Sequence, residues 1–215
     1  MLKQFMRSLV WVLVFFILPL LPKAQVFQRW QIWFAIALAF GLTLTQPAIE
    51  NKGMTEKTNE DKRSLLAIFI MGILGFMVPV LDFTYGRGAS LACACGYIGM
   101  LGAGISIVGL SFRVWSIRML GKFFTSRVEI QVDHQVIQHG PYKWIRHPSY
   151  LGSWVMFLGI SVMLQSHVGF LVSLLGFYFV YQYRIEAEEA ALVQSLGQAY
   201  EDYRQKTWKL VPYIF

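Results

Sequence analysis

Six apolar stretches follow one another along the chain and limit what it can fold into. They cover residues 9–21, 30–45, 65–81, 91–112, 150–164 and 168–183. None of these stretches holds a Lys, Arg, Asp or Glu. A helix needs about 20 residues to cross the hydrocarbon core of a bilayer, and charged residues make up only 14% of the chain. The sequence therefore predicts an all-α integral membrane protein with about six transmembrane helices.

The first stretch has a second interpretation, because Lys3 and Arg7 precede its apolar run as they would in a secretory signal peptide. The following Leu21-Pro22-Lys23-Ala24 is a poor cleavage sequence, since proline and lysine stand where small residues are needed. Another apolar segment also follows at once. We therefore expect a retained helix.

The positions of the basic residues predict how the protein lies in the membrane. Cytoplasmic loops carry an excess of Lys and Arg. With six spans and a cytoplasmic N-terminus, sixteen of the nineteen Lys and Arg residues lie on the cytoplasmic side. We therefore expect both termini, and the polar segments 113–146 and 184–215, in the cytoplasm. Basic residues beside apolar runs indicate contact with membrane lipids and argue against nucleic acid as a partner.

Two parts are expected along the chain. Residues 1–112 would form the N-terminal transmembrane helices, and residues 113–215 would hold a cytoplasmic loop, a helical hairpin and a C-terminal helix. The hairpin is predicted because only Gln165-Ser166-His167 separates the last two apolar stretches. The C-terminal helix is predicted to be amphipathic because apolar side chains recur at helical spacing. These are Leu192, Leu196, Tyr200 and Tyr203.

The fourth apolar stretch is rich in small residues. Small side chains three or four residues apart let helix backbones approach closely in lipid. The members are Gly96, Gly99, Gly102, Ala103, Gly104, Ser106 and Gly109. We expect this helix to pack tightly against a neighbour.

A polar segment precedes the hairpin. Residues 128–132 alternate as in an extended strand, and Gly140-Pro141 predicts a turn. Pro148 suits the first position of a helix, with His147 at its cap. The N–H groups of Ser149 and Tyr150 would then be open to an anionic group. The alternative is a capped helix entering the membrane with no ligand.

A second polar cluster follows the last apolar stretch. Arg184 and Glu188 are four residues apart and share one face of a helix. Ionisable groups at a membrane boundary are often functional, although an ordinary surface ion pair is the alternative. Glu186 and Glu189 are expected in solvent.

The sequence predicts no metal site. Cys93 and Cys95 are only two residues apart, which is not a metal-ligand spacing. His134 and His139 lack a third ligand nearby. Patterns for zinc proteases, phosphate loops and catalytic serine are also missing from the sequence.

The C-terminal half resembles the isoprenylcysteine carboxyl methyltransferase family over about residues 113–215. Several motifs agree in order and spacing. They are His134-Gln135-Val136-Ile137, Gly140-Pro141-Tyr142, Arg146-His147-Pro148-Ser149-Tyr150-Leu151-Gly152, Arg184-Ile185-Glu186-Ala187-Glu188-Glu189, Leu196-Gly197-Gln198-Ala199-Tyr200-Glu201-Asp202-Tyr203 and Pro212.

The resemblance implies S-adenosyl-L-methionine-dependent O-methylation of a carboxylate on a lipophilic, isoprenylcysteine-like substrate. It implies a cytoplasmic cofactor pocket roofed by the C-terminal helices, and Arg184 as the residue that holds the substrate carboxylate. The cofactor contacts that it implies are His134, Gln135, Val136, Ile137, Tyr142, His147, Pro148, Ser149, Tyr150 and Glu188. One further family contact aligns near Arg127, where the residue type differs, so it is not carried over. Ala187 stands where some relatives have a glutamate.

Other functions remain open on the sequence alone. A lipid N-methyltransferase or an NADPH-dependent sterol or enoyl reductase would have a similar C-terminal half, but a phospholipid amine would not need Arg184. A transporter would be expected to place ionisable groups in its spans, which the six stretches lack. The sequence leaves the oligomeric state and the methyl acceptor open.

Overall fold

The computed structural model describes residues 6, 9–10, 13–45, 59–86, 96–124 and 135–212. Within these ranges the protein is helical, as predicted, and its strand-like pairing is the isolated bridge between Ile145 and Trp208. The main helices are α3 (Trp30–Leu44), α4 (Asn59–Tyr85), α6 (Gly96–Leu120), α7 (Pro148–Met163), α8 (His167–Leu196) and α9 (Gln198–Lys206). Shorter elements are η1 (Leu13–Ile17), α2 (Leu18–Leu20), η2 (Leu21–Gln28), η3 (Gly121–Phe123) and η4 (Gly140–Lys143).

The described helices support the predicted membrane character. Three apolar segments are long enough to cross a bilayer, namely Arg63–Tyr85, Gly96–Phe123 and His167–Leu196. The helices α3 and α7 are apolar but shorter. The first predicted span differs from a straight helix, because η1, α2 and η2 are short turns of different type with a non-helical Lys23 between Pro22 and Ala24. Prolines at 19 and 22 explain this break, since proline removes a helical N–H donor.

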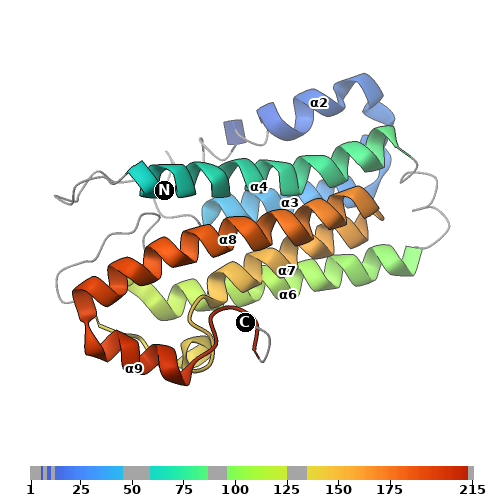
Figure 1. Cartoon of the computed structure of the whole chain (residues 1–215). Helices are drawn as coiled ribbons and strands as arrows, with labels where there is room; N and C mark the ends of the chain where they lie inside the picture. The colour runs from blue at the N-terminus through green and yellow to red at the C-terminus, as the bar shows by residue number, and fades with distance from the viewer. Residues whose placement is uncertain are drawn as a thin grey trace.

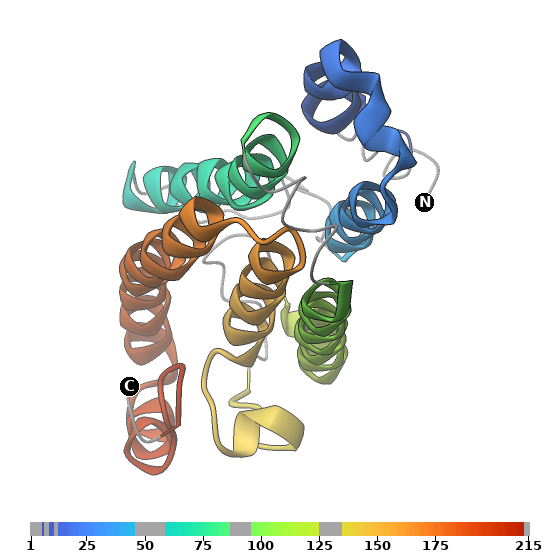
Figure 2. The same ribbon diagram turned by 90° about the vertical axis from the view of Figure 1, so that its right-hand side faces the viewer.

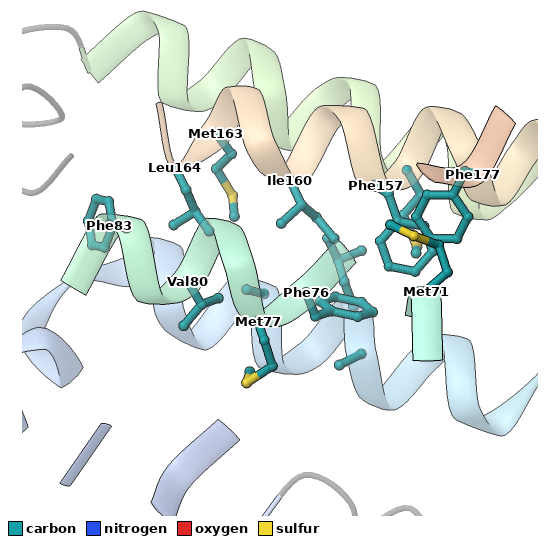
Figure 3. Packing of buried hydrophobic residues seen from close by; sticks show 14 of the residues in the cluster. Met71, Phe76, Met77, Val80, Phe83, Phe157, Ile160, Met163, Leu164 and Phe177 are labelled. Carbon is teal, nitrogen blue, oxygen red and sulfur yellow. The ribbon is translucent and has the colours of Figure 1, made fainter. Parts of the chain in front are cut away.

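The long helices lie side by side, with α4 next to α8 and α6 next to α7 (Figures 1 and 2). Aromatic, aliphatic and methionine side chains fill the space between α4, α7 and α8 (Figure 3). The Phe157 and Phe177 rings stack with centroids 4.3 Å apart, and Phe76 meets Phe157 edge-on at 4.9 Å. All three rings belong to the buried hydrophobic core.

The predicted close packing of the small-residue helix is confirmed. A Cβ atom added at Gly102 would lie 2.2 Å from the backbone nitrogen of Met163, and one at Gly109 would lie 2.4 Å from that of Met156. The helices α6 and α7 therefore touch backbone to backbone. The opposite side of α6 is open, because a Cβ at Gly104 would meet nothing within 4 Å.

The predicted hairpin is also confirmed, and it is tied to α4. Gln165 turns the chain with φ 51°. Ser166 caps α8 by accepting a hydrogen bond from the Gly169 N–H at 2.9 Å. The same hydroxyl donates to Asp82 Oδ2 at 2.6 Å. The turn is therefore fixed at the end of α4 that carries Asp82.

The predicted amphipathic helix through Leu192 and Tyr203 is not one helix. Instead α8 continues to Leu196, and Gly197 breaks the chain with φ 55° before α9 begins. A left-handed glycine commonly ends a helix because it has no Cβ to clash. The break folds α9 back so that Tyr203 is buried. The expected division between residues 112 and 113 falls inside α6. The proposed extended piece, residues 128–132, lies outside the described residues.

Candidate functional site

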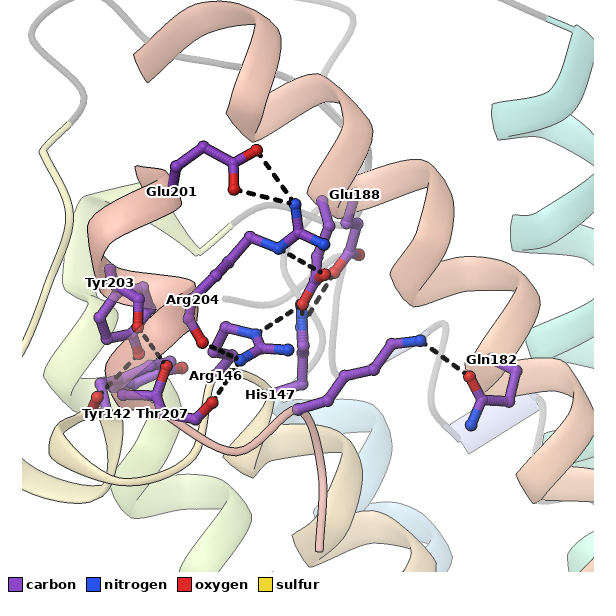
Figure 4. A network of polar contacts seen from close by, with 11 residues as sticks. Tyr142, Arg146, His147, Gln182, Glu188, Glu201, Tyr203, Arg204 and Thr207 are labelled. Atoms are coloured by element: carbon purple, nitrogen blue, oxygen red, sulfur yellow. Dashed lines mark hydrogen bonds and ion pairs between the residues drawn. The ribbon is translucent and has the colours of Figure 1, made fainter. Parts of the chain in front are cut away.

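The two predicted polar clusters meet at one end of the helical bundle (Figure 4). The C-terminal tail holds the first cluster in place by backbone hydrogen bonds. Trp208 N–H donates to the Trp144 carbonyl at 2.9 Å, and Arg146 N–H donates to the Trp208 carbonyl at 2.9 Å. The His147 N–H donates to the Lys209 carbonyl at 3.2 Å. The tail thus fixes the segment that carries Arg146 and His147.

His147 occupies the N-cap position of α7 as predicted, without a capping hydrogen bond from its side chain, and its ring lies between two consecutive glutamates of α8. Its Nδ1 is 3.5 Å from Glu188 Oε2, and its Nε2 is 3.3 Å from Glu189 Oε1. The side chain is 7% exposed. Because both ring nitrogens face a carboxylate, the orientation of the ring depends on α8.

The predicted pair Arg184 and Glu188 forms, and it is not a surface ion pair. The Arg184 side chain is 1% exposed, and its Nε donates to Glu188 Oε1 at 2.9 Å. Its Nη1 donates to Ser64 Oγ of α4 at 2.9 Å. The same Glu188 oxygen accepts a short hydrogen bond from the Tyr150 hydroxyl. Tyr150 on α7 and Arg184 on α8 therefore converge on one carboxylate.

Glu189 contradicts the expectation that it lies in solvent. Its side chain is 8% exposed, and Oε1 accepts a hydrogen bond from Arg146 Nε at 2.7 Å. Its other oxygen lies 3.3 Å from Arg204 Nε of α9. The fold-back at Gly197 covers this face of α8, which is why Glu189 becomes buried. Glu186 is exposed as expected.

The start of α7 differs from the prediction in one respect. Pro148 does occupy the first turn. The Tyr150 N–H donates to the His147 carbonyl at 3.2 Å, so it is not the open donor that we expected. The Ser149 carbonyl accepts a hydrogen bond from Arg113 of α6 at 3.1 Å.

The remaining predicted cofactor contacts differ in how far they are buried. His134 lies outside the described residues. Gln135 is exposed, whereas Val136 and Ile137 are half-buried. Tyr142 is buried, and its carbonyl accepts a hydrogen bond from the Tyr203 hydroxyl at 2.7 Å.

The tyrosines of this region are held in their neutral form. Burial raises the pKa of the Tyr142 and Tyr203 phenols well above the ordinary value, and the pKa of Tyr200 shifts the same way for the same reason. Tyr203 therefore keeps the proton with which it binds the Tyr142 carbonyl. Neutral hydroxyls can serve as donors or acceptors for a bound ligand.

Four residues of the region were not predicted from the sequence: Ser64, Arg113, Arg146 and Glu189. Ser64 reaches Arg184 across 120 residues of chain, and a single sequence carries no signal for such a contact. Arg146 and Glu189 were each part of a motif, yet their pairing forms only where the helical hairpin brings the start of α7 beside α8. In the described parts of the chain, no group of three His, Cys, Asp or Glu residues is placed to hold a metal ion.

Comparison with known proteins identifies the relatives of this segment. Residues 101–194 match the model of the isoprenylcysteine carboxyl methyltransferase (ICMT) family. The predicted resemblance to this family is confirmed. The matched segment runs from the second turn of α6 almost to the end of α8, and so contains the Tyr150, Arg184 and Glu188 cluster.

Similar proteins carry the corresponding name. Protein-S-isoprenylcysteine O-methyltransferase of Tribolium castaneum is 30% identical over 120 residues, which cover 55% of this chain and 43% of that protein. The enzyme of the same name from Saccharomyces cerevisiae is 26% identical over 154 residues, covering 71% of this chain and 64% of that protein. This chain thus spans less than two thirds of the relatives' length.

A solved structure shares the fold. It is described as the eukaryotic intramembrane Ras methyltransferase ICMT, with a TM-score of 0.58 and 23% sequence identity. The match covers 85% of this chain and 63% of the other. It shows that the helical arrangement, including most of the N-terminal half, is that of a known integral membrane fold.

Proposed function

We propose that this protein transfers a methyl group from S-adenosyl-L-methionine to a carboxylate on a lipophilic, isoprenylcysteine-like substrate at the membrane interface. The observation that carries the proposal is the convergence of Tyr150, Arg184 and Glu188 within the segment that matches the ICMT family model. The curated relatives are methyltransferases by name.

The residues around Glu188 suit the proposed cofactor. Glu188 is 21% exposed although its partner Arg184 is buried, so the carboxylate can accept hydrogen bonds from amino or hydroxyl groups. Tyr142 and Tyr150 can offer aromatic faces to a cation. When bound, the cofactor supplies an electrophilic methyl group on a sulfonium. We assign its binding to the ten residues His134, Gln135, Val136, Ile137, Tyr142, His147, Pro148, Ser149, Tyr150 and Glu188.

Arg184 is the residue that we assign to the substrate carboxylate. Glu188 and Ser64 hold its guanidinium from two sides, so its position is fixed before a substrate arrives. A planar guanidinium matches a carboxylate in geometry. An ionised carboxylate is already a nucleophile and needs no general base. The protein's contribution is therefore mainly to orient the reactants and exclude water.

The roles of Arg184 and Glu188 are tested by substitution. We expect Arg184→Ala and Glu188→Ala to abolish methyl transfer from labelled S-adenosyl-L-methionine to a farnesylated cysteine acid. Glu186→Ala is the matched control, because Glu186 lies on the same helix but is exposed, and should keep full activity. Full activity in either site variant would refute the assignment.

A ligand-induced rise in Tm distinguishes the proposed enzyme from related ones, since a ligand bound only by the native state stabilises it. S-adenosyl-L-methionine should raise Tm, and NADPH should not. The opposite result would favour a reductase. An acceptor screen that labels only phospholipid amines would favour a lipid N-methyltransferase instead.

We also propose that both termini and the site face the cytoplasm, with membrane lipids around the helices and a prenylated molecule as partner. The excess of Lys and Arg in segments assigned to that side supports this orientation. A single cysteine introduced at Lys206, with Cys93 and Cys95 replaced, should react with an impermeant reagent only after intact cells are opened. Labelling in intact cells would contradict the orientation.

A further inference from the structure

Arg113 is a buried cation in the apolar helix α6. Its residue is 5% exposed, and its Nε atom is buried without a hydrogen-bond partner. Its Nη1 donates to the Ser149 carbonyl at 3.1 Å, and the guanidinium carbon lies 5.9 Å from the centre of the Phe124 ring. Among the residues that the structure describes, no carboxylate pairs with it. Buried charges in proteins are otherwise paired.

The other buried arginines of the region show the contrast. Arg146 pairs with Glu189, and Arg184 pairs with Glu188. Arg113 has only a neutral carbonyl oxygen and an aromatic face. Its positive charge is therefore the one in this group that no acidic side chain of the described chain balances.

Arg113 also lies beside the proposed site. It contacts the first turn of the 16-residue helix α7 through Ser149. Gly152 brings the backbones together there, because a Cβ at Gly152 would lie 2.6 Å from the Arg113 nitrogen. The phenols of Tyr150 and Tyr142 lie within electrostatic range of the guanidinium. Tyr150 also binds Glu188, so Arg113 and the cluster described above share Tyr150 as a neighbour.

A purely structural role would make Arg113 a connection between α6 and α7. Such a connection does not require a full charge. Ser106 of α6 makes one with a neutral hydroxyl that lies 3.2 Å from the Met156 carbonyl of α7. Removing a guanidinium from water without a counter-ion is far more unfavourable than removing a hydroxyl. An anionic ligand would balance the charge and complete the coordination of Nε.

We propose that Arg113 binds a carboxylate of a ligand in this site, either the amino-acid carboxylate of the methyl donor or the carboxylate of the acceptor. The choice of these two ligands rests on the proposed function. A buried guanidinium with an unpaired Nε favours a carboxylate at this position, because an arginine binds a carboxylate by charge-assisted hydrogen bonds.

The test compares each acid with an analogue that lacks the charge. One pair is S-adenosylhomocysteine and its decarboxylated form, and the other is N-acetyl-S-farnesylcysteine and its primary amide. Dissociation constants are measured by calorimetry for the full-length protein in nanodiscs. The variants are Arg113→Met and Arg113→Lys, with Arg118→Met as control because Arg118 is exposed on the same helix.

In one pair the wild type should prefer the acid, and Arg113→Met should reduce that preference by roughly 10- to 100-fold, the range for a charge-assisted hydrogen bond. Arg113→Lys should keep part of the preference for the acid, and Arg118→Met should keep the whole preference. The pair that responds identifies which carboxylate Arg113 binds.

An unchanged acid preference in Arg113→Met, or no acid preference in the wild type, would overturn the proposal. A lower Tm without ligand together with an unchanged preference would leave Arg113 as a connection between helices only. The proposed function fails separately: wild-type protein that prefers an acid but transfers no methyl group would refute methyl transfer and keep the Arg113 site.

Discussion

Glu189 should be the most sensitive acidic residue of the chain's C-terminal part for stability. Its carboxylate, on α8, contacts Arg146 and His147 immediately before α7 and Arg204 on α9, and so joins α8 to both segments. Glu189→Gln keeps the shape of the side chain and removes the charge. Arg146 would then remain buried without an acidic partner, although the carbonyls of Arg204 and Thr207 still accept from its Nη1.

The size of the effect follows from the exposure of each pair. The Arg146 and Glu189 side chains are 10% and 8% exposed, so this is a buried ion pair. Removing one partner of a buried pair destabilises a protein by about 3–5 kcal/mol. Arg204 is 38% exposed, and its share is therefore small. Because the glutamine oxygen can still accept a hydrogen bond, we expect a loss of about 2–3 kcal/mol in the free energy of unfolding.

The measurement is unfolding from mild detergent by added SDS, followed by tryptophan fluorescence. The control is Glu201→Gln, which breaks the exposed pair with Arg204, where the two side chains are 39% and 38% exposed. The control should change the free energy of unfolding by less than about 0.5 kcal/mol. If Glu189→Gln and Glu201→Gln cost the same, the argument that α9 buries the Glu189 carboxylate is wrong.

Three further substitutions test other parts of the structure. Gly109→Ala should destabilise the protein by about 1–3 kcal/mol, because its Cβ would overlap the α7 backbone. Gly104→Ala, on the open side of α6, should not destabilise it. Equal effects of the two substitutions in thermal unfolding would contradict the packing of α6 against α7. Ser166→Ala should lower the free energy of unfolding by about 1 kcal/mol through loss of the α8 cap, and a change below the error of the measurement would contradict that role. Burial raises the pKa of Tyr203 in the folded state. The neutral Tyr203 phenol therefore contributes fully to stability below the unfolded pKa of about 10, and this contribution decreases as the pH rises above that value. Tyr203→Phe should therefore make stability less dependent on pH between 9 and 11, and an unchanged slope would argue against the burial of this phenol.

Local patterns in the sequence predicted the hairpin and the pairing of Arg184 with Glu188. Both predictions depend only on residues that are close in sequence. The hairpin follows from the short turn at Ser166, and the ion pair follows from a spacing of four residues within one helix. The sequence did not predict the burial of Glu189, because that depends on how far α8 continues and on the backbone conformation of Gly197. The helical spacing of Leu192, Leu196, Tyr200 and Tyr203 continues across this glycine. That spacing does not indicate that the glycine has a positive φ and ends the helix.

Local sequence patterns also did not predict the breaks in the first span or the contact between Ser64 and Arg184. Apolar composition indicated a helix before residue 28, but Pro19 and Pro22 break it into turns. The Ser64 contact forms because α4 packs along α8, and hydrophobic periodicity does not specify which helices become neighbours. The functional motifs were recognisable because they lie in one continuous half of the chain, whereas the Ser64 contact that supports Arg184 comes from the other half.

The proposed reaction of this protein forms a carboxyl methyl ester. The most direct measurement incubates the purified protein in lipid with S-adenosyl-L-methionine labelled at the methyl group and N-acetyl-S-farnesylcysteine. We predict label in the farnesylcysteine that mild base releases as methanol, and none with Arg184→Ala. Label that resists base, or that appears only in lipid amines, would contradict carboxyl methylation, as would equal labelling by the Arg184→Ala protein.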